Sequence, residues 1–395
     1  MKIETLKIKN YKVFKDIEIK DMPSMCVFLG ANGSGKSTLF DVFSFLSDAL
    51  KDNVTIALNK RGGYKEVISR EQTGDIEFEI KFRNEDDGKR GPLTTYTLKI
   101  GIERNVPIIK KEILRYRRGS YGKLWHFLDF TKGTGWGIIN ESDYGKEGIE
   151  EKREEQKLSS PDILAIKGLG QFQKFKAIST FRELLENWYI SNFNIQASKR
   201  TQDIGISEHL STEGENLSRV TQFIHTNHPD IFNNILKNIK ERVPGVINVE
   251  AKETEDGRIV LKFHNEDFKD PFMARYVSDG TLKMFAYLIL LNDPKPYQLL
   301  SIEEPENFLH PALLVELAEE FRMYGNRKSQ VFISTHSPDF VNAIKLEELF
   351  WLIKENGFTT IKRAKEDPLI KKLCEAGDKL GSLWTQNYLS GSGPR

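Results

Sequence analysis

The chain has 395 residues, of which 39% are hydrophobic and 29% are charged, a balance that excludes a largely disordered protein and fits two or three folded domains. Its 58 basic and 57 acidic residues nearly cancel, so only a local patch can attract nucleic acid or anionic lipid. The longest apolar run, Met284 to Leu291, is far shorter than the roughly 20 residues of a spanning helix, and we expect no membrane contact. Two distant cysteines, Cys26 and Cys374, favour a reducing, cytoplasmic setting.

The N-terminal third begins with alternating apolar and charged residues, which predict a β-hairpin over Met1 to Lys20. The continuous apolar run Met25 to Leu29 predicts a strand covered on both faces. Helical spacing from Leu39 to Leu50 predicts a helix after a glycine-rich turn. Antiparallel strands follow between Asp75 and Asn140. They are expected at Ile76 to Phe82, Thr94 to Glu103, Ile108 to Arg117, Leu124 to Phe130 and Trp136 to Ile138.

The rest of the chain changes character twice. Glu141 to Ser160 is highly charged and predicts an exposed connection or a frayed helix. Helical patterns dominate from Ile178 to Glu241, and strands are expected at Val246 to Ala251 and Ile259 to His264. From Thr281 to Ile353 helices and strands alternate, which is typical of a parallel sheet. Heptad arrays are absent from the sequence, so we expect no long coiled coil.

The glycine-rich turn, Gly30 to Ser37, has the sequence Gly-Ala-Asn-Gly-Ser-Gly-Lys-Ser between the predicted strand and helix. This spacing is typical of a phosphate-binding loop, because glycines let backbone N–H groups surround a phosphate chain and the helix adds the positive end of its dipole. We expect Lys36 to reach the β- and γ-phosphates and the Ser37 hydroxyl to ligate Mg²⁺. Both flanks disfavour a mere turn. The expected contacts are Gly30, Asn32, Gly33, Ser34, Gly35, Lys36, Ser37 and Thr38.

Two glutamates, Glu303 and Glu304, follow the predicted strand Gln298 to Ile302. A parallel sheet exposes its active edge at the carboxyl ends of its strands, so one carboxylate can meet Mg²⁺ and the next the attacking water. We therefore expect Glu303 to be the metal ligand and Glu304 the general base. The alternative is an acidic helix N-terminus in which Glu304 and Glu306 only stabilise the dipole before Pro311.

His336 follows a further predicted strand, Gln330 to Ser334. A histidine at this edge can donate to a γ-phosphate and position a water near Glu304. In the alternative interpretation this is a capping turn, with Ser337 starting the helix that Pro338 opens. Both hold together, because the cap does not use the imidazole ring.

Ser278 and Gly280 lie immediately before the apolar helix that starts near Thr281. Serine and glycine before a helix form an N-terminal anion site, and an ordinary N-cap is the alternative.

Taken in order, these four segments resemble ABC-type ATPase heads of the RecF, SMC and OLD (overcoming lysogenization defect) branch. The phosphate loop is followed by Ser-Asp-Gly-Thr-Leu in place of the transporter Leu-Ser-Gly-Gly-Gln, then by Ile-Glu-Glu-Pro-Glu and Ser-Thr-His-Ser-Pro. Asn10 to Phe14 resembles the first hairpin of that branch, and Leu210 to Leu217 the segment before its lid helices. The resemblance implies an α/β head with a mixed or parallel sheet, an antiparallel β subdomain and a helical insertion.

That resemblance also implies a division of the chain and a mechanism. Residues 1–140 would form the first ATPase lobe, 141–265 a helical lid insertion and 266–395 the second lobe. Two heads would bury two ATP molecules head to tail, so that Ser278 and Gly280 of one chain contact the γ-phosphate on the other. The chain would then be a Mg²⁺-dependent ATP hydrolase that forms a homodimer or larger oligomer.

Three residues need comment against the family pattern. Lys12 is expected near the phosphates, as a basic residue there is in relatives. Glu303 stands where many members carry aspartate, and its longer arm still ligates Mg²⁺ in this branch. Gln72 is the only nearby candidate for the glutamine that members use before the signature segment, and we do not assign it.

The resemblance suggests partners as well. Stand-alone members often work beside a separately encoded effector, commonly a TOPRIM-type nuclease, in anti-phage defence. Fewer than sixty residues follow His336, too few for such a nuclease domain, so we expect a separate effector. One alternative is a RecF-like repair ATPase that binds nucleic acid, for which Arg115-Tyr116-Arg117-Arg118 is a candidate contact. The other is a nucleotide-dependent scaffold with slow turnover. The role of Pro368 to Trp384 is not predicted.

Overall fold

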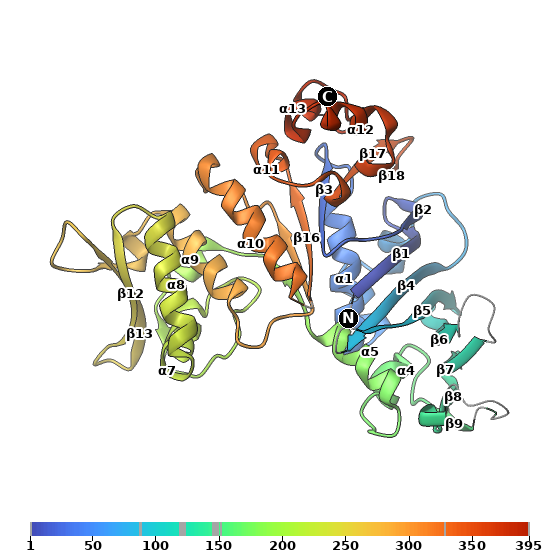
Figure 1. Ribbon diagram of the computed structural model, residues 1–395. Coiled ribbons are helices and arrows are strands. Elements are labelled where there is room, and N and C mark those ends of the chain that lie inside the picture. Colours follow the sequence, from blue (N-terminus) through green and yellow to red (C-terminus); the bar gives the residue numbers. More distant parts are fainter. Residues whose placement is uncertain are drawn as a thin grey trace.

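The computed structural model describes residues 2–86, 89–117, 124–143, 150, 152–327 and 329–393. The chain forms three sheets, with the central one between the antiparallel sheet and a small third sheet (Figure 1). Arg118 of the basic run falls outside the described residues.

The central sheet has six strands in the order β10-β15-β16-β3-β17-β18. The first five run parallel to their neighbours, and β18 closes one edge antiparallel to β17. The parallel sheet that the alternating pattern predicted is therefore confirmed. The strands are β10 (Trp188–Ser191), β15 (Leu299–Glu303), β16 (Gln330–Thr335), β3 (Met25–Gly30), β17 (Leu349–Glu355) and β18 (Phe358–Arg363).

Strand β3 is buried at every position because helices cover both faces of this sheet. Met25, Val27 and Leu29 enter the core that contains α9 (Asp279–Leu291) and α10 (Leu314–Asn326). Cys26 and Phe28 point the other way, into the core that contains α1 (Lys36–Lys51). The period of two along the strand thus divides one apolar run between two cores.

The second sheet is antiparallel and has the order β2-β1-β4-β5-β6-β7-β8-β9. It confirms the predicted hairpin and the five predicted strands between residues 75 and 140. Its strands are β1 (Lys2–Tyr11), β2 (Phe14–Ile19), β4 (Ile76–Asp86), β5 (Lys89–Glu103), β6 (Val106–Arg117), β7 (Leu124–Thr131), β8 (Thr134–Ile138) and β9 (Arg153–Lys157). Two short helices, α2 (Val54–Asn59) and α3 (Tyr64–Val67), link α1 to this sheet.

Strand β9 corrects the expectation for the charged segment Glu141 to Ser160. Its sequence, Arg-Glu-Glu-Gln-Lys, has no apolar residue, yet it pairs with β8 from Thr134 to Ile138. An edge strand satisfies its backbone groups by pairing and needs no apolar side chain, so hydropathy gives no sign of it.

Strand β10 is a strand that was not predicted within the region from Ile178 to Glu241, where helical patterns dominate. Helix α5 (Lys176–Glu186) ends just before β10, which pairs with β15 at the edge of the central sheet. Four residues are too few to show a period of two. After β10 the chain forms α6 (Ile195–Ser198), α7 (Leu217–Asn227) and α8 (Pro229–Arg242).

A third, small sheet lies beside α7 and α8, at the opposite end of the molecule from the antiparallel sheet (Figure 1). Its strands are β11 (Gln202–Asp203), β12 (Val246–Glu253), β13 (Arg258–Asn265) and β14 (Phe272–Met273). The described helices between residues 141 and 265 contribute to both hydrophobic cores. Helices α4 (Ala165–Leu169) and α5 pack with the antiparallel sheet, whereas α7 and α8 pack with α9.

The C-terminal segment packs on the helix that follows the His336 turn. Ser382 N donates to Asn342 Oδ1 at 3.2 Å, joining α13 (Leu380–Thr385) to α11 (Pro338–Asn342). A Cβ at Gly381 would lie 2.0 Å from the Pro338 carbonyl oxygen, so the close approach requires glycine. Helix α12 (Pro368–Glu375) precedes α13. Short 3-10 turns occupy Glu141–Asp143, Ala274–Tyr276, Pro311–Leu313, Leu346–Glu348 and Ala364–Glu366.

The helices of the described residues are all short. Helix α1, with 16 residues, is the longest in the described part of the chain, which contains no long coiled coil. Among the same residues, no helix combines the length and apolar character needed to cross a membrane.

Candidate nucleotide site

The loop from Gly30 to Ser37 connects the carboxyl end of β3 to the first turn of α1. Gly33 and Gly35 have φ angles of +74° and +104°, in the left-handed region that favours glycine. A Cβ at Gly35 would also lie 2.9 Å from a methyl carbon of Val13. The sequence therefore folds into a tight loop that leaves room for a phosphate chain above the α1 N-terminus.

Lys36 is buried inside this loop. Its Nζ donates to the carbonyl oxygens of Gly30 at 2.8 Å and Ala31 at 3.2 Å. Burial lowers the pKa of Lys36, and nearby carboxylates, that of Glu304 first, oppose the shift. The ammonium therefore sits where it can exchange a loop carbonyl for a phosphate oxygen.

Ser37 and Glu303 meet at the edge of the central sheet. Ser37 Oγ donates to Glu303 Oε2 at 2.7 Å. A hydroxyl and a carboxylate are oxygen ligands that Mg²⁺ prefers, so the pair fits this ion. No cluster of three or more His, Cys, Asp or Glu suited to a metal occurs among the described residues, so Mg²⁺ held here would need further oxygens from phosphate and water.

Ser34 supports a phosphate ligand independently. Its hydroxyl is buried and has no hydrogen-bond partner within the described part of the chain. Buried polar groups are normally paired, so an oxygen-rich ligand beside this hydroxyl is the physical expectation. The residues present thus fit both triphosphate and Mg²⁺.

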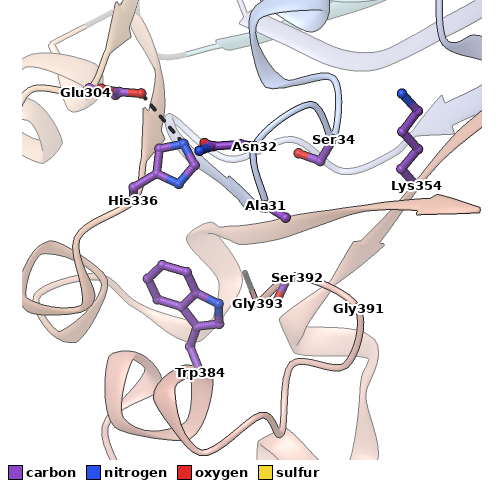
Figure 2. A pocket seen from close by; sticks show the side chains of 11 residues that line it. Ala31, Asn32, Ser34, Glu304, His336, Lys354, Trp384, Gly391, Ser392 and Gly393 are labelled. Atoms are coloured by element: carbon purple, nitrogen blue, oxygen red, sulfur yellow. Dashed lines mark ion pairs between the residues drawn. The ribbon is translucent and has the colours of Figure 1, made fainter. Parts of the chain in front are cut away.

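Glu304 and His336 form a second pair beside the phosphate loop, with Glu304 Oε1 3.6 Å from His336 Nε2 (Figure 2). Glu304 has a φ of +45°, which is uncommon for a residue with a side chain. Its N–H donates to the Ser334 carbonyl at 2.9 Å. Burial, and then the charge of Lys36, lower the pKa of His336. The imidazole is therefore neutral at pH 7.

Glu306 is a residue whose part in this arrangement sequence reasoning missed. Its Oε1 accepts from Thr335 Oγ1 and from the His336 N–H, both at 2.7 Å. The carboxylate thereby fixes the turn that carries the imidazole. The signal in the sequence is a third glutamate in the segment Glu303 to Glu306, for which residue type alone predicts only an interaction with a helix dipole.

Two cavities share Asn32, Glu304 and His336. One of about 350 Å³ lies over the phosphate loop and reaches Lys36 and Ser37. The other, of about 820 Å³, extends to the C-terminal segment (Figure 2). No sequence signal pointed to the residues of its far wall. These are Lys354, Trp384, Gly391, Ser392 and Gly393.

Ser278 and Gly280 lie elsewhere. Neither Ser278 nor Gly280 is among the described residues that line the two cavities. Ser278 Oγ accepts from the Thr281 N–H at 3.1 Å, so Ser278 is the N-cap of α9. A Cβ at Gly280 would lie 2.5 Å from the Phe308 carbonyl oxygen. The structure does not bring this segment to the phosphate loop of its own chain.

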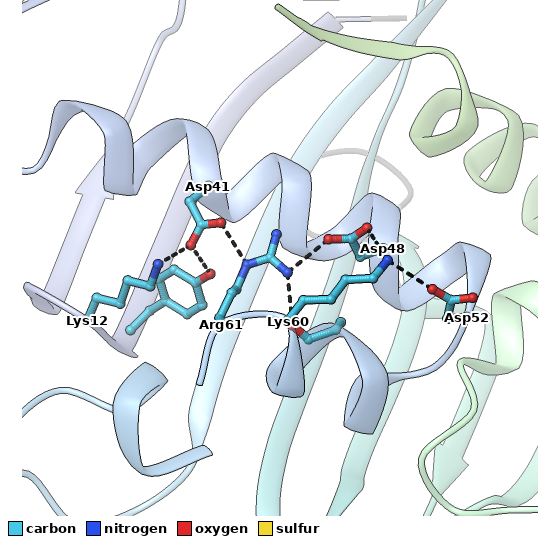
Figure 3. Close-up of polar contacts among 8 residues, drawn as sticks. Lys12, Asp41, Asp48, Asp52, Lys60 and Arg61 are labelled. Carbon is cyan, nitrogen blue, oxygen red and sulfur yellow. Dashed lines mark hydrogen bonds and ion pairs between the residues drawn. The ribbon is translucent and has the colours of Figure 1, made fainter. Parts of the chain in front are cut away.

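Lys12 pairs with Asp41 of α1 (Figure 3). Its Nζ donates to Asp41 Oδ2 at 2.5 Å, and the same carboxylate accepts from Tyr11 Oη and Arg61 Nε, each at 2.7 Å. Lys12 is not among the described residues that line the two cavities, and neither is Gln72. A contact between Lys12 and a phosphate stays a prediction.

The central parallel sheet, the phosphate loop and the acidic residues at the carboxyl end of β15 define a P-loop nucleotide-binding protein of the ATPase class. The chain belongs to the family described as "AAA domain, putative AbiEii toxin, Type IV TA system", whose profile matches residues 25–342. A comparison with curated proteins found no match.

Solved structures resemble more than nine-tenths of the chain. An Smc head bound to the C-terminal winged-helix domain of ScpA has a TM-score of 0.55 at 16% identity, covering 92% of this chain and 97% of that one. An Smc head with an extended coiled coil, bound to the C-terminal domain of ScpA derived from Pyrococcus furiosus, has a TM-score of 0.51 at 14% identity, with coverages of 95% and 99%. These similarities confirm the predicted α/β ATPase-head fold.

Proposed function

We propose that this protein is an ATP hydrolase of the RecF/OLD-like branch, in which two copies close around two ATP molecules and thereby control a separate effector. One observation carries this proposal. Lys36, the Ser37–Glu303 pair and the Glu304–His336 pair surround a single cavity at the carboxyl ends of parallel strands. Phosphoryl transfer requires little more than such positioning and charge compensation.

Each of these side chains has a distinct proposed role. Lys36 neutralises charge on the β- and γ-phosphates, and Ser37 with Glu303 would hold Mg²⁺, which would compensate further phosphate charge. Glu304 accepts the proton of the attacking water as general base. Neutral His336 donates to the γ-phosphate and orients that water toward Glu304.

A second copy is proposed because this chain presents its signature segment away from its own phosphate loop. Ser278 caps α9, and the positive end of this 13-residue helix attracts an anion. In the proposed dimer Ser278 and Gly280 approach the γ-phosphate held by Lys36 of the other copy. Nucleotide then stabilises the closed dimer because both surfaces bind it, and hydrolysis releases the dimer.

The proposal of a separate effector rests on the partners named for related proteins. The family description names a toxin of a toxin–antitoxin system, and both Smc heads are bound to a partner, ScpA. We infer a separate effector in anti-phage defence, a TOPRIM-type nuclease being the first candidate. Both cysteines are free, which supports a reducing, cytoplasmic setting.

The proposed function is tested by measuring the molar mass of the Glu304→Gln protein with and without ATP, together with its rate of ATP hydrolysis. We expect hydrolysis to fall by about 10²–10⁴-fold because the general base is lost. Light scattering should show a dimer that persists with ATP and dissociates without it. Glu375→Gln, on exposed α12, is the matched control and should behave as wild type.

Lys36→Ala is the complementary variant and should neither bind ATP nor dimerise in its presence. A Glu304→Gln protein that binds ATP yet stays monomeric would overturn the dimer. Unchanged hydrolysis in that variant would overturn the role of Glu304, and effector control without any turnover in the wild type would favour the scaffold.

A further inference from the structure

Lys283 is a buried cation one turn inside α9, with only 5% of its surface exposed. Its Nζ donates to the carbonyl oxygens of Glu304 at 3.1 Å and Asn307 at 2.9 Å. Both acceptors belong to the five residues that follow β15, here named the Glu304–Phe308 loop. A buried ammonium is costly unless its hydrogen bonds are made, so these two bonds tie α9 firmly to the loop.

The charge environment shows that this burial is only partly compensated. Burial lowers the pKa of Lys283 to about 8, while the carboxylates of Glu306 and Glu304 oppose the shift. The side chain also lies over the rings of Tyr287 and Phe308. Lys283 is therefore enclosed between the helix and the loop rather than extended toward water.

The bond to Glu304 acts on the backbone of the proposed general base. The Glu304 N–H is held by the Ser334 carbonyl at 2.9 Å, and its own carbonyl is held by Lys283. A positive φ of +45° between these anchors is a conformation that its surroundings must maintain. This conformation places the Glu304 carboxylate 3.6 Å from His336.

The start of α9 also lies directly against the loop. A Cβ at Gly280 would be only 2.5 Å from the Phe308 carbonyl oxygen. Asn307 contributes from the loop side, because its Nδ2 donates to Glu304 Oε2 at 2.8 Å. A displacement at the N-terminus of α9 therefore also moves the loop and, with it, the Glu304 side chain.

We propose that Lys283 is a positioning residue that couples the two nucleotide sites of the dimer. It transmits the position of α9, set by the ATP on the second copy, to Glu304, which acts on the ATP of its own chain. This inference rests on the proposed function. Its consequence is that occupation of one site raises turnover at the other.

The test is the dependence of hydrolysis rate on ATP concentration in the full-length protein. For wild type we expect a sigmoidal curve, with a Hill coefficient between about 1 and 2 for two coupled sites. Lys283→Met keeps the length of the side chain and removes the ammonium. We expect this variant to show a Hill coefficient of about 1 and a kcat lowered about tenfold, with ATP affinity at the phosphate loop unchanged.

Two further variants separate coupling from stability. Met284→Ala alters the next residue of α9, which is buried in the same core and makes no hydrogen bond to the loop carbonyls. It should lower the melting temperature and keep the wild-type Hill coefficient. Lys283→Arg keeps a cation with N–H donors for both carbonyl oxygens and should keep a Hill coefficient above 1. If the methionine variant does not fold, the shorter and uncharged Lys283→Gln replaces it and should show a Hill coefficient of about 1.

The two levels of the proposal fail in different ways. If ATP does not double the mass of the hydrolysis-impaired Glu304→Gln protein, the proposed function is wrong. If mass doubles but Lys283→Met keeps the wild-type Hill coefficient, or the wild-type curve is hyperbolic, the dimer stands and the coupling role of Lys283 is overturned.

Discussion

Ser37 Oγ donates a hydrogen bond of 2.7 Å to Glu303 Oε2 although 266 positions separate the two residues. Strands β3 and β15 flank β16 in parallel, so their carboxyl ends reach the same edge of the sheet. This brings the hydroxyl at the start of α1 to the carboxylate that ends β15, and the two groups together offer oxygen atoms of the kind that Mg²⁺ prefers.

The first prediction concerns this pair. Glu303→Ala should weaken the Mg²⁺-dependent part of ATP binding by at least about tenfold, because one of the two protein ligands is lost. Titration calorimetry with Mg²⁺ and with EDTA measures that part. Binding in EDTA should change little, and Glu316→Ala, at an exposed position of α10, is the control. Full Mg²⁺ dependence in Glu303→Ala would contradict the assignment.

The second prediction concerns the pH dependence of hydrolysis. Burial and the charge of Lys36 lower the pKa of His336, so the ring becomes charged only at a more acidic pH than an ordinary histidine. Protonation then pairs the ring with Glu304 and withdraws the base from water. Wild-type kcat should therefore decline toward acid pH.

The corresponding variant is His336→Gln, compared with wild type across pH 5.5 to about pH 8.5. It should be slower at neutral pH by about 10²-fold or more and should lose the part of the acid decline that the imidazole causes. An identical pH profile in both proteins would assign that decline to another group.

The third prediction concerns the polar cluster that Lys12 and Arg61 form with Asp41 of α1 (Figure 3). Burial raises the pKa of Asp41, but the hydrogen bond from Lys12 and the charge of Arg61 outweigh it and hold the pKa below its usual range. A depressed carboxyl pKa contributes stability at neutral pH that is lost as the pH falls through the folded-state pKa.

Asp41→Asn should therefore lower the free energy of unfolding at pH 7 by about 1–3 kcal/mol, since Arg61 and Lys12 lose a charged acceptor. The difference between variant and wild type should shrink at acid pH. Urea unfolding at pH 7 and at acid pH measures both values. A difference that stays constant with pH would show that the Asp41 charge is not what stabilises the cluster.

The fourth prediction concerns Glu112, which is fully buried on β6. It accepts from the Ala165 and Ile166 N–H groups at the start of α4 and from Tyr96 Oη. Burial raises the pKa of Glu112 from 4.5 to about 7. The folded protein thus binds a proton that the unfolded chain releases, so stability falls as the pH rises from 4.5 to about 7.

Glu112→Gln should remove that decline, which amounts to up to about 3 kcal/mol. It should also destabilise the protein at acid pH by about 1–3 kcal/mol, because an amide N–H would face a backbone donor. Thermal and urea unfolding from pH 5 to about pH 8 test both effects. A variant with an unaltered pH slope would contradict the assignment.

Local patterns were sufficient for much of the fold. The run Met25 to Leu29, the glycine spacing from Gly30 to Ser37 and the helical spacing after it predicted one strand, loop and helix correctly. Strands β9 and β10 were missed because they are short and their pairing partners, not their hydropathy, decide their conformation.

The candidate site also contains residues that the sequence proposed and residues that it did not. Residue type, spacing and the resemblance to ABC-type heads together proposed the phosphate loop, Glu303, Glu304 and His336, because each chemical role restricts which side chains can serve. The sequence did not indicate that Glu306 holds the His336 turn or that Trp384 lines the larger cavity.

Chemistry that resides in a few consecutive residues was thus determined by the sequence itself, since backbone geometry and residue type act over one turn or one strand. Beyond the predicted Ser37–Glu303 pair, tertiary structure alone decided which distant residues meet: Lys12 with Asp41, and Lys283 with the Glu304–Phe308 loop. The physical reason is that hydrogen bonds and desolvation act over a few ångströms, and only packing of the whole chain brings such groups within that range.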